Sequence, residues 1–511
     1  MNQLMRRKTI ADCEADIAQR SGLKRSLTRW HLTALGVGAT IGAGIFATTG
    51  TAIVGDAARP GAGPAIVLSF LLTAVACGFA ALCYAEFASM VPVSGSAYTY
   101  AYAALGELVA WIIGWDLIIE YAVGNIGVAI GWSGHFRELL THFGVHLPAY
   151  LATDLRSARD AAAAIAQGST DPTMQYLASA LTSAPMILGF PVIANLPAFL
   201  AVTVVTVVLV IGVRESADAN NAMVLLKIGI ILFFIAVGIF LIKPENWNNP
   251  ATGGFAPNGV AGISAGAAII FFSYIGFDAV STAAEEAQNP AKDMPFGIIM
   301  SLVICTVLYI ALSLVMTGLA PWQSLGTAEP MLTALSHASG PPALIKFSSF
   351  IIALGAVIAM GSVLLVFQLG QPRIFFSMAR DGLLPPFIAR VHPRFKTPYV
   401  GTIITGVFVG CFAAFANIAE VVDLTNIGTL FAFVLVSIGV IVLRRTDPDR
   451  LRPFRVPGVP FTPLISVVAC FYLMKQLPTI TWIRFGLWLL VGLAIYFLYG
   501  IRHSRLRGRP G

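Results

Sequence analysis

Long apolar runs recur along almost the whole chain and are separated by short polar segments. A membrane-spanning helix needs roughly 20 apolar residues, and runs near or above that length occur at 32–53, 64–90, 97–136, 190–213, 217–242, 259–285, 294–320, 341–378, 398–417, 419–443, 461–478 and 480–501. The third and eighth runs exceed one membrane thickness and must tilt or extend into solvent. This pattern predicts an all-α polytopic membrane protein with twelve transmembrane helices.

Composition and charge support a multi-pass protein. Of the 511 residues, 57% are hydrophobic and only 11% are charged, against roughly 25% charged in soluble domains. Most Lys and Arg residues fall in segments that share a side with the N-terminus, above all in the loops 373–396 and 444–455. By the positive-inside rule both termini should be cytoplasmic, in a plasma membrane that we expect to be a bacterial inner membrane.

The polar end segments, 1–31 and 502–511, are therefore expected to be cytoplasmic. The first segment lacks the apolar core of a signal peptide, so the first span should direct insertion. The net charge of +7 does not indicate nucleic-acid binding, because the basic residues lie between the spans and would face lipid head groups. The six cysteines show no ligand spacing, and we expect no disulfide, metal or cofactor.

The first apolar run contains an unusual concentration of glycine at Ala39–Phe46 and just before it, with Gly36, Gly38, Gly42 and Gly44. Glycine costs about 1 kcal/mol relative to alanine in a helix interior. In hydrocarbon, a backbone group freed by a break needs a partner in the protein or in a water-lined cavity. These residues fit either a broken helix that holds a ligand or a close GxxxG packing face.

A second interruption lies in the sixth run, at Ser264–Ala279, where Ser273, Gly276 and Asp278 break an apolar stretch. Five spans separate the two interruptions, and halves of five spans have opposite membrane orientation. Interruptions at matching positions of two such halves indicate a transporter site between inverted repeats. We therefore expect a 5+5 inverted repeat of 32–242 and 259–443, with broken helices 1 and 6 and two extra helices in 461–501.

The longest connection, 137–189, is expected outside, with a surface helix at Asp154–Ala166. His135, His142 and His146 lie near its start, but no acidic or cysteine partner at suitable spacing accompanies them. We therefore expect no metal site there.

Several motifs occur in the same order as in a known family. They are Gly36–Phe46 (GVGATIGAGIF), Pro92–Tyr100 (PVSGSAYTY), Gly114–Tyr121 (GWDLIIEY), Trp132–Gly134 (WSG), Phe271–Pro295 (FFSYIGFDAVSTAAEEAQNPAKDMP) and Gly370–Pro385 (GQPRIFFSMARDGLLP). Together they resemble the amino acid–polyamine–organocation superfamily, and most closely its cationic amino acid transporter family. The resemblance runs from about residue 28 to 500, and the span count is similar to that of bacterial-type members. It implies a LeuT-like fold and amino acid transport.

An amino acid zwitterion needs donors for its carboxylate and acceptors for its ammonium group. A broken helix offers both, because its second half begins with free N–H groups at the positive end of a dipole and its first half ends with free carbonyls. The resemblance implies that the N–H groups around Gly42, Ala43 and Gly44 bind the carboxylate. It also implies that the carbonyl of Thr40 in span 1, with those of Phe272 and Ile275 in span 6, binds the ammonium group. The expected backbone site comprises Thr40, Ile41, Gly42, Ala43, Gly44, Phe272, Ser273 and Ile275.

Two side chains are further candidates for contact with the substrate. Phe272 lies where the superfamily places an aromatic lid, so we expect it to act as a gate; the alternative is a ring that faces lipid or the core. Met360, in the eighth span, is a candidate for the side-chain pocket, although methionine commonly serves core packing.

Lys227 is a single charge within the fifth span. Residues 228–242 give about 22 Å of helix, which is short of the ~30 Å hydrocarbon core, so the lysine should lie inside it. Ionisable groups at such depth are costly and usually functional. In sodium-coupled relatives a cation bridges spans 1 and 8 nearby, and the resemblance implies that this lysine replaces it in proton coupling. The alternative is that Lys227 snorkels to the surface.

Glu120 lies one turn from Asp116, so both carboxylates share a helical face. Glu120 could contact a cationic substrate or carry a proton; alternatively it pairs with a neighbouring helix or with water. We expect Asp278 to cap or orient the helix after the second break rather than to touch substrate.

The leading hypothesis is a secondary active transporter of L-amino acids, cationic or small and neutral, driven by proton symport through alternating access. The alternative is an amino acid or polyamine antiporter without net proton coupling. A channel would need a filter motif or charge ring, and an enzyme would need a motif such as HExxH or GxSxG. The spans contain no filter motif, charge ring or HExxH, and the one GxSxG match, Gly262–Gly266 (GISAG), lies inside the sixth apolar run and not between a strand and a helix, so we expect no enzymatic activity.

Overall fold

The computed structural model describes residues 4, 6–7, 26–90, 96–166, 172–187, 189–212 and 217–507. Residues 92–95 of the second motif, and most of the segment 1–31, lie outside this part. The N-terminal half contains helices α2 (Arg29–Thr40), α3 (Thr49–Val54), α4 (Ile66–Met90), α5 (Ser96–Ala104), α6 (Glu107–Ile118), α7 (Gly124–His142), α8 (Leu155–Ala166), α9 (Pro172–Ser183), α10 (Leu196–Ile211) and α11 (Ala217–Gly238).

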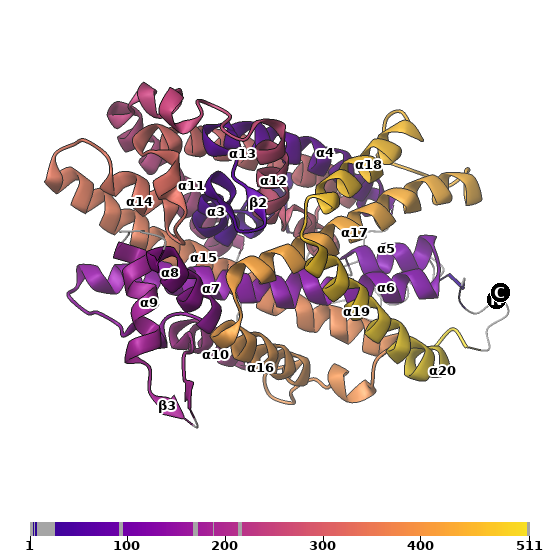
Figure 1. Ribbon diagram of the computed structural model, residues 1–511. Coiled ribbons are helices and arrows are strands. Elements are labelled where there is room, and N and C mark those ends of the chain that lie inside the picture. Colours follow the sequence, from indigo (N-terminus) through magenta and orange to yellow (C-terminus); the bar gives the residue numbers. More distant parts are fainter. Residues whose placement is uncertain are drawn as a thin grey trace.

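The remaining helices are α12 (Gly259–Ile270), α13 (Pro290–Leu319), α14 (Pro330–Ser336), α15 (Pro342–Arg380), α16 (Tyr399–Phe415), α17 (Ile418–Thr446), α18 (Phe461–Lys475), α19 (Thr479–Ile495) and α20 (Ile501–His503). The strands are two short antiparallel hairpins, β1 (Gly55–Asp56) with β2 (Arg59–Pro60) and β3 (Met186–Ile187) with β4 (Phe190–Pro191). In Figure 1, α8, α9 and α14 lie at one end of the molecule and α20 lies at the other.

Each of the twelve expected runs contains at least one apolar helix. Within the described residues, nine helical stretches are long and apolar enough to cross a membrane, and α10, α16 and α18 are shorter apolar helices. At 1.5 Å per residue these three are shorter than the ~30 Å hydrocarbon core. The protein is therefore a predominantly helical, multi-pass membrane protein, while the count of twelve and the domain division stay predictions.

The third expected run, 97–136, is not one helix. It divides into α5 and a second helical stretch that begins at α6, because Gly106 has a φ of 103° that side chains other than glycine rarely adopt. The amides of Leu105 and Gly106 both donate to the Ala101 carbonyl and end α5. The expectation of a single overlong span was therefore wrong, and a helix-ending glycine explains why.

The segment after the third span contains two helices rather than one. The helix expected at Asp154–Ala166 is present as α8, and α9 was not expected. Small residues of both helices, among them Ala158 and Ala180, form a separate buried cluster. This segment therefore has a small core of its own.

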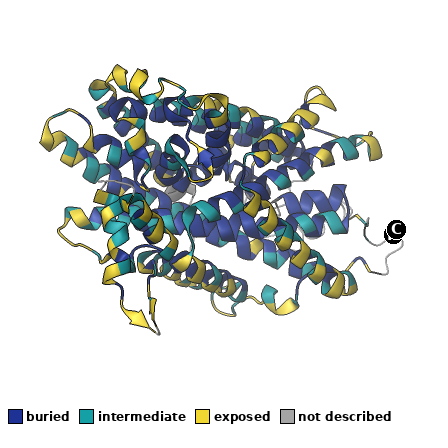
Figure 2. Cartoon of the chain, viewed as in Figure 1, coloured by how far each residue is buried: buried dark blue, intermediate teal, exposed yellow. Residues whose placement is uncertain are grey.

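Helices from the two expected repeats pack in a reciprocal way. The first half of span 1, α2, packs on α13 of span 7, and α12 of span 6 packs on α4 of span 2. Buried residues concentrate in central helices such as α7 and α15 (Figure 2), whereas exposed apolar side chains such as Val204, Val407 and Leu490 lie on outer helices. The reciprocal packing is consistent with an inverted repeat, which stays a prediction.

The buried carboxylate of Glu86 in α4 pairs with the partly exposed Arg444 of α17, and Arg452 Nε lies 3.4 Å from the same carboxylate. Glu86 accepts hydrogen bonds from Arg444 Nε at 2.9 Å and Nη2 at 2.7 Å, and from the amide of Val456 at 2.7 Å. Removing one partner of such a pair leaves the other charge poorly compensated and typically costs about 3 kcal/mol or more. We expect Glu86→Ala to lower the thermal unfolding midpoint by several degrees. The control Glu245→Ala, at an exposed position, should leave the midpoint unchanged. Equal midpoints would contradict a structural role for this pair.

Candidate functional site

The interruption expected in span 1 is present. Helix α2 ends at Thr40, Ile41 is extended with φ −75° and ψ 98°, and helical structure resumes as a π-helical turn at Gly44–Thr48 before α3. The Thr40 hydroxyl donates back to the Gly36 carbonyl at 2.7 Å. The first N–H groups of a helical segment have no partner in a preceding turn, so this geometry exposes backbone donors around Gly42.

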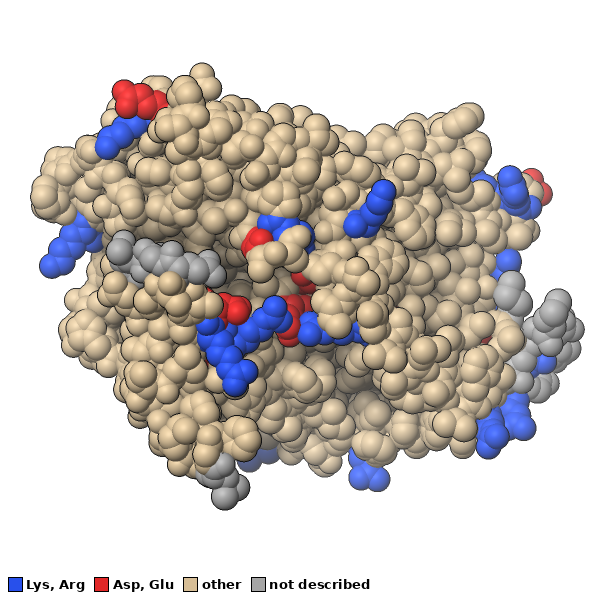
Figure 3. All heavy atoms as spheres, in the orientation of Figure 1, with Lys and Arg blue, Asp and Glu red and all other residues tan. Residues whose placement is uncertain are grey.

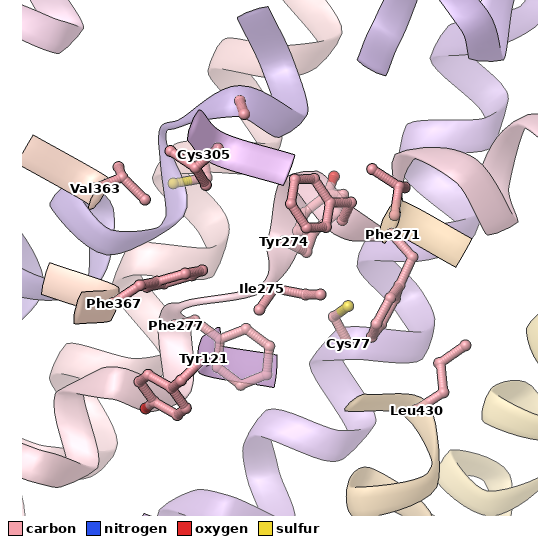
Figure 4. Packing of buried hydrophobic residues seen from close by; sticks show 14 of the residues in the cluster. Cys77, Tyr121, Phe271, Tyr274, Ile275, Phe277, Cys305, Val363, Phe367 and Leu430 are labelled. Carbon is pink, nitrogen blue, oxygen red and sulfur yellow. The ribbon is translucent and has the colours of Figure 1, made fainter. Parts of the chain in front are cut away.

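The interruption expected in span 6 is also present. After α12, a short 3₁₀ turn covers Phe271–Tyr274, Ile275 is extended, and Gly276 has a φ of 119° before a 3₁₀ helix at Phe277–Glu286. Figure 4 shows the unwound chain at Ile275, with Val363 and Phe367 on one side and Phe271 and Tyr274 on the other. Gly276 therefore permits this break, because residues with a side chain rarely adopt such a positive φ.

The two breaks lie against each other. A Cβ atom on Gly44 would stand 2.3 Å from Ser273 Cα and 2.6 Å from its amide nitrogen. A Cβ atom on Gly276 would stand 2.8 Å from the carbonyl carbon and oxygen of Ala39. Glycine at both positions thus brings the backbones of spans 1 and 6 together, and the expected backbone site is one contiguous region.

Tyr309 on α13 belongs to this region and was not expected. Its hydroxyl donates to the Thr40 carbonyl at 3.1 Å, which is the carbonyl assigned above to a substrate ammonium group. A carbonyl has two lone pairs, so Thr40 keeps one acceptor position. The sequence shows only that a tyrosine interrupts an apolar span. The hydrogen-bond partner of Tyr309 depends on packing between helices that are distant in the sequence.

Lys227 lies in α11 and is 1% exposed. Its ammonium donates to the Gly38 carbonyl at 2.5 Å, in the last turn before the span 1 break. The side chain thus points to span 1 instead of snorkelling to the surface. A change in the charge or contacts of this lysine would act directly on the first half of the broken helix.

Apolar side chains surround the two breaks. A Cβ atom on Gly127 of α7 would lie 3.4 Å from both Phe272 Cζ and Val421 Cγ1, and one on Gly131 would lie 3.5 Å from Met360 Sδ. Val363 of α15 is 3.0 Å from the corresponding position of Gly42. Phe272, only 5% exposed, therefore faces α7 and α17 and not lipid, and Met360 borders the region.

Two buried carboxyl groups, Glu120 and Asp278, lie close together, and a third, Asp116, lies one helical turn from Glu120. Glu120 sits in a π-helical turn at Ile119–Val123, a feature frequent at functional sites, and its carboxyl group lies beside that of Asp278. Asp278 thus faces Glu120, which the sequence did not reveal, while Asp116 Oδ1 lies 3.0 Å from the Cβ position of Gly428.

Among the described residues, no group of three or more His, Cys, Asp or Glu side chains has an arrangement that could hold a metal ion. The roles of the site residues named above stay predictions.

Comparison with known proteins gives a consistent answer. A model of the amino acid permease family matches residues 27–498. The branched-chain amino acid permease BcaP of Bacillus subtilis (strain 168) is 45% identical over 505 residues, which cover 98% of this chain and 99% of that protein. The methylthioribose transporter of the same organism is 44% identical over 506 residues, covering 99% and 100%.

More distant relatives include cationic amino acid transporters. The vacuolar cationic amino acid transporter 4 of Arabidopsis thaliana is 36% identical over 455 residues, which cover 88% of this chain and 68% of that protein. These relatives are named as transporters or permeases, not as enzymes. With its broken spans and this match over almost its full length, the chain belongs to the amino acid permease family of the amino acid–polyamine–organocation superfamily.

Proposed function

We propose that this permease is a proton-coupled symporter of L-amino acids with apolar, neutral side chains, working by alternating access around spans 1 and 6. The observation that carries the proposal is the contact of two helix breaks, through Gly44 with Ser273 and Gly276 with Ala39, within apolar surroundings. Both termini would be cytoplasmic and α8 and α9 external.

The backbone of the breaks suits the shared part of every amino acid. N–H groups at Gly42, Ala43 and Gly44 would hold the carboxylate at a positive helix end. Carbonyls at Thr40, Phe272 and Ile275 would accept from the ammonium group. The side chains at these positions must be small enough for the substrate to approach the backbone closely. Gly42, Ala43 and Gly44 meet this requirement.

The side-chain pocket favours an apolar substrate. Phe272, Met360, Val363 and Val421 surround the breaks. A cationic side chain would have to lose its hydration among these apolar side chains, which is costly. The 45% identical relative is named as a branched-chain amino acid permease, which agrees with this choice.

Proton coupling would use groups already in contact with the moving parts. Lys227 donates to the Gly38 carbonyl of span 1, and Glu120 of span 3 lies beside Asp278 of span 6. Gain or loss of a proton at either place changes hydrogen bonding at a broken helix. Each would thus bias the equilibrium between inward-facing and outward-facing states.

Uptake into proteoliposomes tests this function. We expect an inward proton gradient to drive accumulation of labelled leucine, with competition by valine and isoleucine and little by arginine, putrescine or methylthioribose. Counterflow without proton-driven accumulation would favour the exchange mechanism. Strong competition by arginine or methylthioribose would reassign the substrate class.

Gly127→Ala tests the side-chain pocket. The new methyl group would lie 3.4 Å from Phe272 Cζ and Val421 Cγ1, an ordinary contact that the fold accommodates but that reduces free space. We expect leucine and isoleucine to bind about tenfold more weakly, with alanine affected less. Gly78→Ala, on α4, is a matched control because its nearest neighbour is 4.0 Å away; equal effects of both substitutions would place the pocket elsewhere.

A further inference from the structure

The connection between α15 and α16 carries positive charges that its own sequence does not balance. Within this basic segment, residues 386–398, the side chains of Arg390, Arg394 and Lys396 are exposed. The sequence contains no Asp or Glu at residues 382–419. In the part of the chain that the structure describes, none of the three basic side chains takes part in an ion pair. The charges are therefore available to an anion from outside the protein.

The other dense basic loop, 444–455, differs because it contains two aspartates and contacts a third acid. Arg444 and Arg452 approach the buried Glu86 carboxylate at 2.7 Å and 3.4 Å. Basic and acidic side chains also adjoin in the central hollow of Figure 3. At the lower edge of that view, the side on which α16 lies in Figure 1, basic side chains stand apart from the acidic ones. The excess of positive charge is thus a property of particular places and not of the whole surface.

The basic segment has a fixed shape. The amide of His392 donates to the Thr397 carbonyl at 2.8 Å, and the amide of Lys396 donates to the His392 carbonyl at 2.9 Å. The amides of Arg394 and Phe395 both donate to His392 Nδ1 at 3.2 Å. These bonds close a tight loop, so Arg394 and Lys396 project from one small turn of the backbone.

This loop is attached to the end of a membrane helix. Thr397 Oγ1 donates at 2.8 Å to the carbonyl of Val210 in the last turn of α10, and α16, which begins at Tyr399, packs on α10. Ile211 of α10 and Ile403 of α16 are exposed apolar residues near these helix ends. The basic segment therefore lies where two lipid-facing helices reach the membrane surface.

Exposed apolar side chains accompany the charges. Phe387 and Val391 are 46% and 45% exposed and lie on either side of Arg390 in the sequence. A segment that exposes both basic and apolar side chains suits the boundary between lipid head groups and acyl chains. A free phosphate ion would match the charges alone and would leave the phenyl ring and the valine in water.

We propose that the basic segment binds an anionic phospholipid of the cytoplasmic leaflet. Its head group would lie among Arg390, Arg394 and Lys396, and its acyl chains would lie against Phe387 and Val391. The choice of leaflet rests on the orientation proposed above, whereas the site itself depends neither on the substrate nor on proton coupling. Each basic side chain near an anionic membrane surface typically strengthens binding about fivefold.

Lipid binding to the purified full-length protein tests this site. Native mass spectrometry measures the affinity for phosphatidylglycerol, with phosphatidylcholine of the same acyl chains as the reference lipid. We expect phosphatidylglycerol to bind about tenfold more tightly. The triple variant Arg390→Gln/Arg394→Gln/Lys396→Gln should lose most of this preference, while its affinity for phosphatidylcholine stays unchanged. Added inorganic phosphate should not displace the lipid from the wild-type protein.

Two further triple variants control for a general effect of charge. Each replaces three exposed basic residues with Gln, on the opposite side of the protein in the first variant and on the same side in the second. The two sets are Arg159, Lys243 and Lys346, and Arg445, Arg455 and Arg502. Both variants should keep most of the preference for phosphatidylglycerol. Phe387→Ala should weaken the binding of both lipids, because it removes a contact with acyl chains and no charge.

An unchanged lipid preference in the folded Arg390→Gln/Arg394→Gln/Lys396→Gln variant would overturn the site. An equal loss in either control variant would also overturn it, since general charge attraction would then explain the binding. Displacement of the lipid by phosphate would assign the charges to a soluble anion. Thermal unfolding midpoints verify folding, and Arg394→Gln/Lys396→Gln replaces the triple variant if that variant is unfolded. The measurement does not involve transport, so absence of leucine uptake would reject the proposed function and leave the lipid site standing.

Discussion

Lys227→Met is expected to remove proton-driven accumulation of leucine while leaving leucine counterflow measurable. The ammonium group bonds the Gly38 carbonyl immediately before the span 1 break. Methionine preserves much of the side-chain length but can neither carry a charge nor donate to that carbonyl. We expect the accumulation ratio under an inward proton gradient to fall about tenfold, to nearly the value without a gradient.

The control for this prediction is a lysine that lies at the exposed end of an apolar helix. Lys475, the last residue of α18, is exposed, and Lys475→Met should leave accumulation unchanged. Proton-driven accumulation at the wild-type level in Lys227→Met would show that this lysine does not couple transport to protons. Loss of counterflow as well would assign it to substrate binding or to the fold.

Gly276→Ala is expected to weaken leucine binding by about a hundredfold, the scale of a 1 Å displacement at a reacting or binding centre. The φ of 119° is strained for alanine, and the new Cβ would stand 2.8 Å from backbone atoms of Ala39 and 3.0 Å from the amide nitrogen of Thr40. Since the obstacle is backbone and not a flexible side chain, the two breaks must move apart. Equilibrium binding of labelled leucine to the purified protein measures the loss.

Gly259 supplies the matched control. It also has a positive φ, of 54°, but nothing lies within 4 Å of its Cβ position, so Gly259→Ala introduces backbone strain without a collision. We expect its leucine affinity to stay near that of the wild-type protein. Similar affinities in the two variants would show that close contact of the breaks is not required for binding.

The fold was largely predictable from the sequence because membrane spans depend on local composition. The apolar runs located every long helix, and the glycines of Ala39–Phe46 and of the sixth run located both breaks. Gly106 was read as part of a continuous run, since a single glycine reveals a positive φ only when its neighbours are placed. The helix α9 was missed because its apolar residues are few and pack only on α8 and nearby segments.

The site was predictable where its chemistry is made by the backbone, and less so where it depends on contacts between distant helices. The contact of Gly44 with Ser273 follows from two local patterns that the fold brings together. The bond from Tyr309 to Thr40 and the proximity of Asp278 to Glu120 depend on how distant helices are aligned against each other, which no local sequence pattern specifies. Lys227 was predictable in part: its depth in the membrane followed from the length of the fifth span, but its bond to the Gly38 carbonyl did not.

The most direct test of the central claim is the position of a bound substrate, measured in an experimental structure determined with saturating L-leucine. The account predicts leucine density between the breaks, with its carboxylate within hydrogen-bond distance of the amides of residues 42–44 and its side chain toward Phe272, Met360 and Gly127. Ordered leucine elsewhere in the protein, with the two breaks in contact but without ligand, would contradict it.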